Sequence, residues 1–234
     1  VFLLLETIAR RWVGNAADRG VFVQGGFRSN MGIVGLAYCI NAYGDEGLKA
    51  ASLYLGIVTI LFNILAVITL SRASHRENAL GKTLKGVVTN PLIIGILLGM
   101  PVSVLNIPLP EFVVHTGEYF AKMTLPLALL CTGGALSLKT MNDESRLTFG
   151  ASAAKLLLVP LLMTGTAAWL GFRGIELGIL LLMTSAPTAA ASYVMVRSIG
   201  GNATAAANII AVTTLGSILT TSVGIMVLKH LHWM

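Results

Sequence analysis

Charged residues are scarce in this sequence. Asp, Glu, Lys and Arg make up 11% of its 234 residues, whereas a typical soluble domain contains about 25%. Hydrophobic residues make up 55% of the chain, and its mean hydropathy is +0.81. These values exclude an ordinary water-soluble domain and indicate an integral membrane protein.

Catalytic and metal-binding motifs are also missing. The sequence contains no HExxH, GxSxG, CxxC or Walker motif. Its two cysteines, Cys39 and Cys131, both fall inside apolar runs, where we expect small apolar filler rather than a disulfide. The histidines lie outside these runs and lack metal-ligand spacing. We therefore predict no enzymatic activity, no catalytic residue, no cofactor and no metal site, and no aromatic-interleaved basic helix points to a nucleic acid.

Long uncharged runs dominate what is present, and they predict an all-α integral membrane fold. A helix needs roughly 17 to 25 apolar residues to cross a bilayer. We predict seven spans, near residues 21–43, 48–70, 88–107, 118–138, 147–170, 175–197 and 203–228. The opening VFLLLETIARRW looks like the end of a further helix, so we expect the chain to begin partway through a larger protein. Short connections make residues 1–234 a single transmembrane domain.

The distribution of positive charge predicts the orientation of these spans. If the spans alternate, eleven of the 16 Lys and Arg residues fall on one side: Arg10, Arg11, Arg19, Arg28, Arg72, Arg76, Lys82, Lys85, Lys139, Arg146 and Arg197. The positive-inside rule makes this side cytoplasmic. The net charge of +6 is then explained by topology. We expect a multi-pass protein of the cell membrane, in bacteria the inner membrane.

Two predicted spans are interrupted by polar and small residues. They are GGFRSNMGIVGLAYCINAYGDEG at 25–47 and TSAPTAAASYVMVRSIGGN at 184–202. They lie five crossings apart, so they run in opposite directions, as in an inverted repeat. Irregular backbone survives in a membrane only where protein or a water-filled cavity surrounds it. We therefore expect two broken helices at a cavity, with helix N-termini that favour an anion. The alternative is a simple kink at Pro187 with close packing of small residues.

Four segments resemble the auxin efflux carrier family, which includes plant auxin exporters and bacterial malonate or malate permeases. They are FRSNMGIVGLAYCINAYG at 27–44, TNPLIIGILLGM at 89–100, LPLALLCTGGALSL at 125–138, and SAPTAAASYVMVRSIGGN with TTLGSILT between 185 and 220. The resemblance covers nearly the whole chain.

The resemblance implies ten spans in two inverted five-helix repeats, with spans four and nine broken and crossing. Residues 1–72 would end the first repeat, residues 88–234 would form the second, and roughly two and a half spans would precede the chain. The family often has GLP where this chain has GLA, with Ala37 in the proline position. The first break must then rely on Asn30, Gly32 and Gly35.

Candidate substrate-binding residues follow from the two interruptions and from the family motifs: Asn30, Gly32, Gly35, Thr132, Gly133, Gly134, Pro187, Thr188 and Ser192. Asn30 can bind a substrate carboxylate or cap a helix. Gly133 and Gly134 either line the substrate site or allow close packing of helices. Lys155 lies about eight residues inside a predicted span. It is either a coupling group or a counter-charge for helix C-termini, and we expect it to face the protein interior.

These features predict a secondary transporter, a permease or efflux carrier that moves a small mono- or dicarboxylate across the membrane by alternating access. No Asp or Glu lies deep in a span, which argues against a carboxylate proton relay. The expected partners are a small organic anion, membrane lipid and a coupling proton or sodium ion, and a homodimer is left open. The alternatives are a sodium-coupled organic-anion symporter of the bile-acid type and a non-transporting membrane sensor with the same fold.

Overall fold

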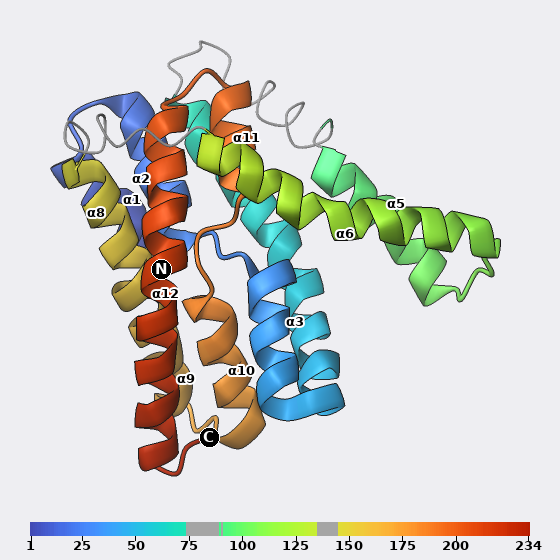
Figure 1. The fold of residues 1–234 in the computed structure, drawn as a ribbon. Coiled ribbons are helices and arrows are strands. Elements are labelled where there is room, and N and C mark those ends of the chain that lie inside the picture. The colour runs from blue at the N-terminus through green and yellow to red at the C-terminus, as the bar shows by residue number, and fades with distance from the viewer. Residues whose placement is uncertain (74–88, 90, 135–144) are drawn as a thin grey trace.

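The computed structural model describes residues 1–73, 89, 91–134 and 145–234, and this part of the chain is almost entirely helical (Figure 1). Its elements are α1 (Phe2–Trp12), α2 (Ala16–Phe27), η1 (Met31–Gly35), α3 (Leu36–Ala73), α5 (Pro91–Val104), α6 (Glu111–Gly134), α8 (Ser145–Ala153), η2 (Ala154–Leu158), α9 (Val159–Trp169), α10 (Gly174–Ser185), α11 (Ala191–Ser198) and α12 (Ala203–His230). The prediction of an all-α membrane fold is confirmed.

Among the described residues, three helical stretches are long and apolar enough to cross a membrane: Met31–Leu70, Arg146–Trp169 and Ala203–His230. The first contains a reversal at Gly44, whose φ of 60° and ψ of −140° interrupt α3. Glycine adopts this positive φ without a Cβ clash. The chain therefore folds back on itself at Gly44, which joins the predicted spans 21–43 and 48–70 at one end of the bundle (Figure 1).

The predicted span 147–170 is one continuous helical stretch made of α8, η2 and α9. The π-helical turn η2 carries Lys155 and ends two residues before Pro160. Proline has no N–H, so the carbonyl of Leu156 loses its usual helical donor. A locally wider turn is a common response to such a lost bond.

The predicted spans 88–107 and 118–138 overlap α5 and α6. These two helices form an arm that extends away from the bundle in Figure 1. Contacts between α6 and α12 and between α5 and α3 connect the arm to the bundle. The last four residues of the predicted span 118–138, residues 135–138, lie outside the described residues.

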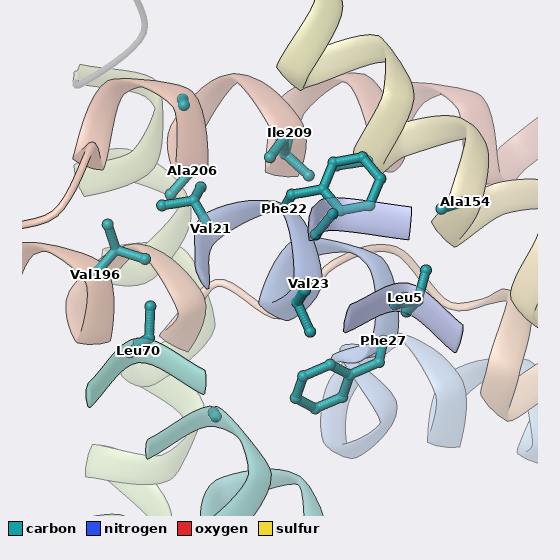
Figure 2. Packing of buried hydrophobic residues seen from close by; sticks show 14 of the residues in the cluster. Leu5, Val21, Phe22, Val23, Phe27, Leu70, Ala154, Val196, Ala206 and Ile209 are labelled. Atoms are coloured by element: carbon teal, nitrogen blue, oxygen red, sulfur yellow. The ribbon is translucent and has the colours of Figure 1, made fainter. Parts of the chain in front are cut away.

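The principal core surrounds α2, which is buried from Gly20 to Phe27. Figure 2 shows its side chains among those of α1, α3, η2, α11 and α12, and the cluster also includes Ala151 of α8. Phe27 makes edge-to-face contacts with Phe2 and Phe62, at centroid distances of 5.4 and 5.2 Å. A Cβ on Gly25 would lie 3.1 Å from Ile209, so this glycine lets α12 approach α2 closely.

A second apolar cluster packs the other half of the bundle. It joins Met31, Cys39 and Ala51 to Ile179, Leu182 and Met183 of α10. The ends of α2 and α10 lie between the two clusters, where the chain is interrupted in both segments (Figure 1). The fold thus holds two interrupted helices inside a packed bundle.

Candidate functional site

The two interrupted helices meet at a short antiparallel bridge between Ser29 and Thr188. The Asn30 N–H donates to the Pro187 carbonyl at 2.7 Å, and the Ala189 N–H donates to the Arg28 carbonyl at 3.0 Å. The breaks therefore cross in opposite directions and pair their freed backbone groups with each other. A simple kink at Pro187 does not describe this arrangement, and the predicted contact between the two stretches is confirmed. We call this region the crossing, meaning Arg28–Asn30 and Ala186–Ala190.

Local sequence explains where α10 stops. Pro187 cannot donate a backbone hydrogen bond and disfavours helical backbone at the preceding residue. Ala186 accordingly has a φ of −55° and a ψ of 143°. The first break covers Arg28–Asn30, and Arg28 is extended with a φ of −80° and a ψ of 104°. Gly32 and Gly35 lie beyond this break, in η1.

Two threonines add further hydrogen bonds at the second break. The buried Thr188 hydroxyl donates to the Gly25 carbonyl at 2.7 Å. The Thr188 N–H donates to the Thr213 hydroxyl of α12 at 3.1 Å. The crossing is thus held by side chains as well as by its own backbone.

Lys155 lies on one side of the crossing and is fully buried. Its Nζ donates to the Ser29 hydroxyl and, at 2.6 Å, to the carbonyl of Thr184 near the end of α10. The expectation that Lys155 faces the protein interior is confirmed. Carbonyl groups at a helix C-terminus carry partial negative charge. The contact with the Thr184 carbonyl therefore places Lys155 as a counter-charge to the end of α10.

Arg28 is a second buried cation, and the assignment of this residue to the cytoplasmic charge set is wrong. Arg28 is 5% exposed and lies within the bundle, because α2 ends at Phe27 beside the crossing. Nη2 donates to Asn63 Oδ1 at 2.6 Å, and Nη1 lies 2.6 Å from Met195 Sδ. The available signal in the sequence was the position of Arg28 directly before Ser29 and Asn30 in an interrupted span.

Neither buried cation has a carboxylate partner among the residues that the structure describes. The ion pairs found there join Glu111 to His115 and Glu118 to Lys122, each at 3.5 Å on exposed faces of α6. The crossing therefore carries positive charge in a buried environment. Such charge is costly unless an acceptor or an anion compensates it.

Several buried polar side chains have atoms without a protein partner in the described part of the chain. They are Gln24 Oε1, Asn63 Nδ2, Ser192 Oγ and both amide atoms of Asn208. Gln24 Nε2 lies 3.6 Å from Met195 Sδ, the sulfur that Arg28 also contacts. Gln24, Arg28, Asn63 and Met195 thus form one polar cluster, which we call the arginine cluster.

The structure brings some of the residues predicted from sequence together and separates others. Asn30, Pro187 and Thr188 lie in the crossing, and Ser192 is buried at the start of α11. The Asn30 side chain has no hydrogen bond to the described residues. Instead, its carbonyl accepts from the N–H groups of Val34 and Gly35.

The predicted glycines have different surroundings. A Cβ on Gly35 would lie 2.7 Å from Met183 Sδ, whereas a Cβ on Gly32 would find its nearest neighbour, Leu55, at 3.8 Å. Gly35 therefore permits close packing against α10, and Gly32 is exposed. The last three residues of α6 are Thr132, Gly133 and Gly134, and the structure describes only their backbone.

Comparison with known proteins agrees with this architecture. Residues 13–225 match the family described as "Membrane transport protein". The chain belongs to this family. The family is that of the auxin efflux carriers, so the resemblance seen in the sequence motifs is confirmed. An "Uncharacterized transporter" of Methanothermobacter thermautotrophicus is 26% identical over 166 residues, which cover 71% of this chain and 54% of that relative. The chain is thus a multi-pass membrane protein of a transporter family, and the match spans about half the length of this relative.

Proposed function

We propose that this chain forms the transport domain of a secondary transporter for a small organic anion, a mono- or dicarboxylate. The observation that carries the proposal is the buried crossing, with Arg28 in it and Lys155 beside it, neither of which has a described carboxylate partner. Two buried basic side chains favour an anion over a cation. Transport by alternating access would expose this region to each side of the membrane in turn.

The candidate site comprises the crossing and the nearby residues Asn30, Gly35, Pro187, Thr188 and Ser192. Partially charged N-termini of η1 and α11 begin beside the crossing, and such termini attract anions. Residues 1–72 and 88–234 are proposed to belong to two inverted repeats, because the interrupted segments run in opposite directions. The end of α6, with Thr132, Gly133 and Gly134, is included by family resemblance.

Transport assays with the intact protein test this function. Proteoliposomes would be given radiolabelled acetate, malonate or malate, with labelled choline as a cationic control. We expect saturable uptake of at least one carboxylate and none of choline. Uptake of choline alone, or of none of these compounds, would contradict the proposal.

The same vesicles separate the alternative functions. Flux that requires a sodium gradient would assign the protein to sodium-coupled symport, and flux that follows a pH gradient would indicate proton coupling. A carboxylate that raises the melting temperature without being transported would indicate a sensor, because a ligand stabilises the state that it binds.

A further inference from the structure

We propose that Arg28 binds the carboxylate group of the transported anion, at the arginine cluster formed with Gln24, Asn63 and Met195. This inference rests on the proposed function and adds the residue, and the face of the crossing, at which the anion binds. Arg28 is buried and beside the helix break, yet one of its two described acceptors is a thioether sulfur.

The first argument is the mismatch between the donors of Arg28 and the acceptors around it. A guanidinium group carries five N–H donors in a planar fork, which matches the two oxygens of a carboxylate. A thioether is a weak acceptor, so Met195 compensates the charge poorly. Asn63 supplies one amide oxygen, at 2.6 Å. A substrate carboxylate would therefore be a much stronger partner than Met195.

The second argument distinguishes Arg28 from Lys155. The ammonium group of Lys155 has three donors, and two of them reach oxygen acceptors, Ser29 Oγ and the Thr184 carbonyl. Lys155 is thus largely compensated by the protein itself. Arg28 has a single oxygen acceptor in the described structure, so it has the greater remaining capacity for an anion.

The third argument concerns the side of the crossing on which each cation lies. Arg28 and Ser29 are successive residues of extended backbone, whose side chains point to opposite sides. Ser29 faces Lys155 and Thr184, whereas Arg28 faces Asn63 of α3 and Met195 of α11. The anion would accordingly bind between α3 and α11, away from Lys155.

The other members of the arginine cluster fit this role. Asn63 Nδ2 is a buried donor without a described partner, and it can donate to an anion that Arg28 binds. Gln24 Nε2 also points to the Met195 sulfur. Methionine is flexible and polarisable, so it can withdraw from Arg28 at low cost. Ser192 lies one helical turn before Met195 and offers a further hydroxyl.

Asn63→Asp is the most informative variant, because it supplies Arg28 with a permanent carboxylate at the position of the present amide oxygen. The melting temperature of the ligand-free variant is measured alongside to confirm folding, because the desolvation of a new buried carboxylate opposes its attraction to Arg28. We expect Asn63→Asp to weaken uptake of malonate or acetate roughly 10- to 100-fold in KM, because the new carboxylate competes with the substrate. A purely structural role for Arg28 would leave KM unchanged both in Asn63→Asp and in Arg28→Lys.

Two further variants complete the test in the intact protein. Arg28→Lys keeps the charge but loses the planar fork, and we expect an increase in KM smaller than that of Arg28→Gln. Arg11→Gln removes the same charge from an exposed position and serves as the matched control, with unchanged KM. If Arg28→Gln does not fold, Asn63→Asp and Arg28→Lys still decide the question.

The outcomes separate this inference from the function on which it rests. If the wild-type protein takes up no carboxylate, the proposed function fails. If it takes up malonate or acetate, and Asn63→Asp and Arg28→Lys leave KM unchanged, the proposed function stands and Arg28 is not the anion-binding residue.

Discussion

At the scale of single residues, the two buried cations share a position relative to helix ends. Arg28 is the C-terminal cap of α2, and Lys155 donates to Thr184 near the C-terminus of α10. Carbonyl groups at these ends carry partial negative charge, which offsets part of the cost of burying a cation. This arrangement explains how positive charge is tolerated in an apolar bundle without a described carboxylate partner.

Substitutions of Lys155 test this electrostatic account. Lys155→Gln retains an N–H donor for the Thr184 carbonyl, whereas Lys155→Glu places a carboxylate against that carbonyl and the end of α10. We expect the Glu variant to be less stable than the Gln variant by about 2 kcal/mol or more, because it reverses the interaction with the helix end. Thermal unfolding in detergent measures the difference. Equal melting temperatures would show that Lys155 does not act as a counter-charge.

Thr213 tests the hydrogen bonds that hold the second break. Its hydroxyl accepts from the buried Thr188 N–H at 3.1 Å, so Thr213→Val leaves that donor without a partner. We expect a loss of about 1 to 3 kcal/mol in stability, the usual cost of an unsatisfied buried polar group. Thr214→Val is the matched control, because the Thr214 hydroxyl bonds within its own helix to Ile210. Similar stabilities for the two variants would contradict this role for Thr213.

At the scale of helices, the close contact between η1 and α10 depends on Gly35. A Cβ at this position would lie 2.7 Å from Met183 Sδ, so Gly35→Ala forces Met183 to move within the second apolar cluster. We expect Gly35→Ala to lower stability by about 1 to 3 kcal/mol, as overpacking does. Gly32→Ala, whose Cβ would have ordinary contacts at 3.8 Å, should change it little. Thermal unfolding of both variants checks the contrast, and equal effects would refute it.

The helix interruptions were predictable from sequence because their cause is local. Pro187 removes a backbone donor, and polar residues inside two apolar runs mark where the backbone leaves the helix. The depth of Lys155 was predictable from its distance to the nearest end of an apolar run. These features depend on residues close together in the chain, which a single sequence displays directly.

Arg28 could not be placed in the same way. A charge beside an apolar run usually marks the end of a span, and Arg28 directly precedes the uncharged residues from Ser29 to Gly44. The structure starts α2 at Ala16, after the cap residue Asn15, whose side chain accepts from the Ala17 N–H. This earlier start brings Arg28 to the interior end of α2. Its partners Asn63 and Met195 belong to other helices, and no local pattern predicts such contacts.

At the scale of the whole molecule, charge differs between the two ends of the bundle. The turns between α1 and α2 and between α11 and α12, with the start of α8, lie at one end in Figure 1. The reversal at Gly44 and the turn between α9 and α10 lie at the other. Arg10, Arg11, Arg19, Arg146 and Arg197 gather at the first end, so the removal of Arg28 from the cytoplasmic set leaves the predicted orientation unchanged.

Cysteine labelling in intact cells tests this orientation. Arg11 and Glu46 are both exposed and belong to opposite ends of the bundle. In a background that carries Cys39→Ala and Cys131→Ala, we expect Glu46→Cys to react with a membrane-impermeant maleimide from outside. Arg11→Cys should react only after the membrane is permeabilised, because the positive-inside rule keeps the arginine-rich end in the cytoplasm. The opposite labelling pattern would invert the assigned topology. It would also mean that basic residues do not orient this bundle, since Arg10, Arg11 and Arg19 would then lie on the outer side.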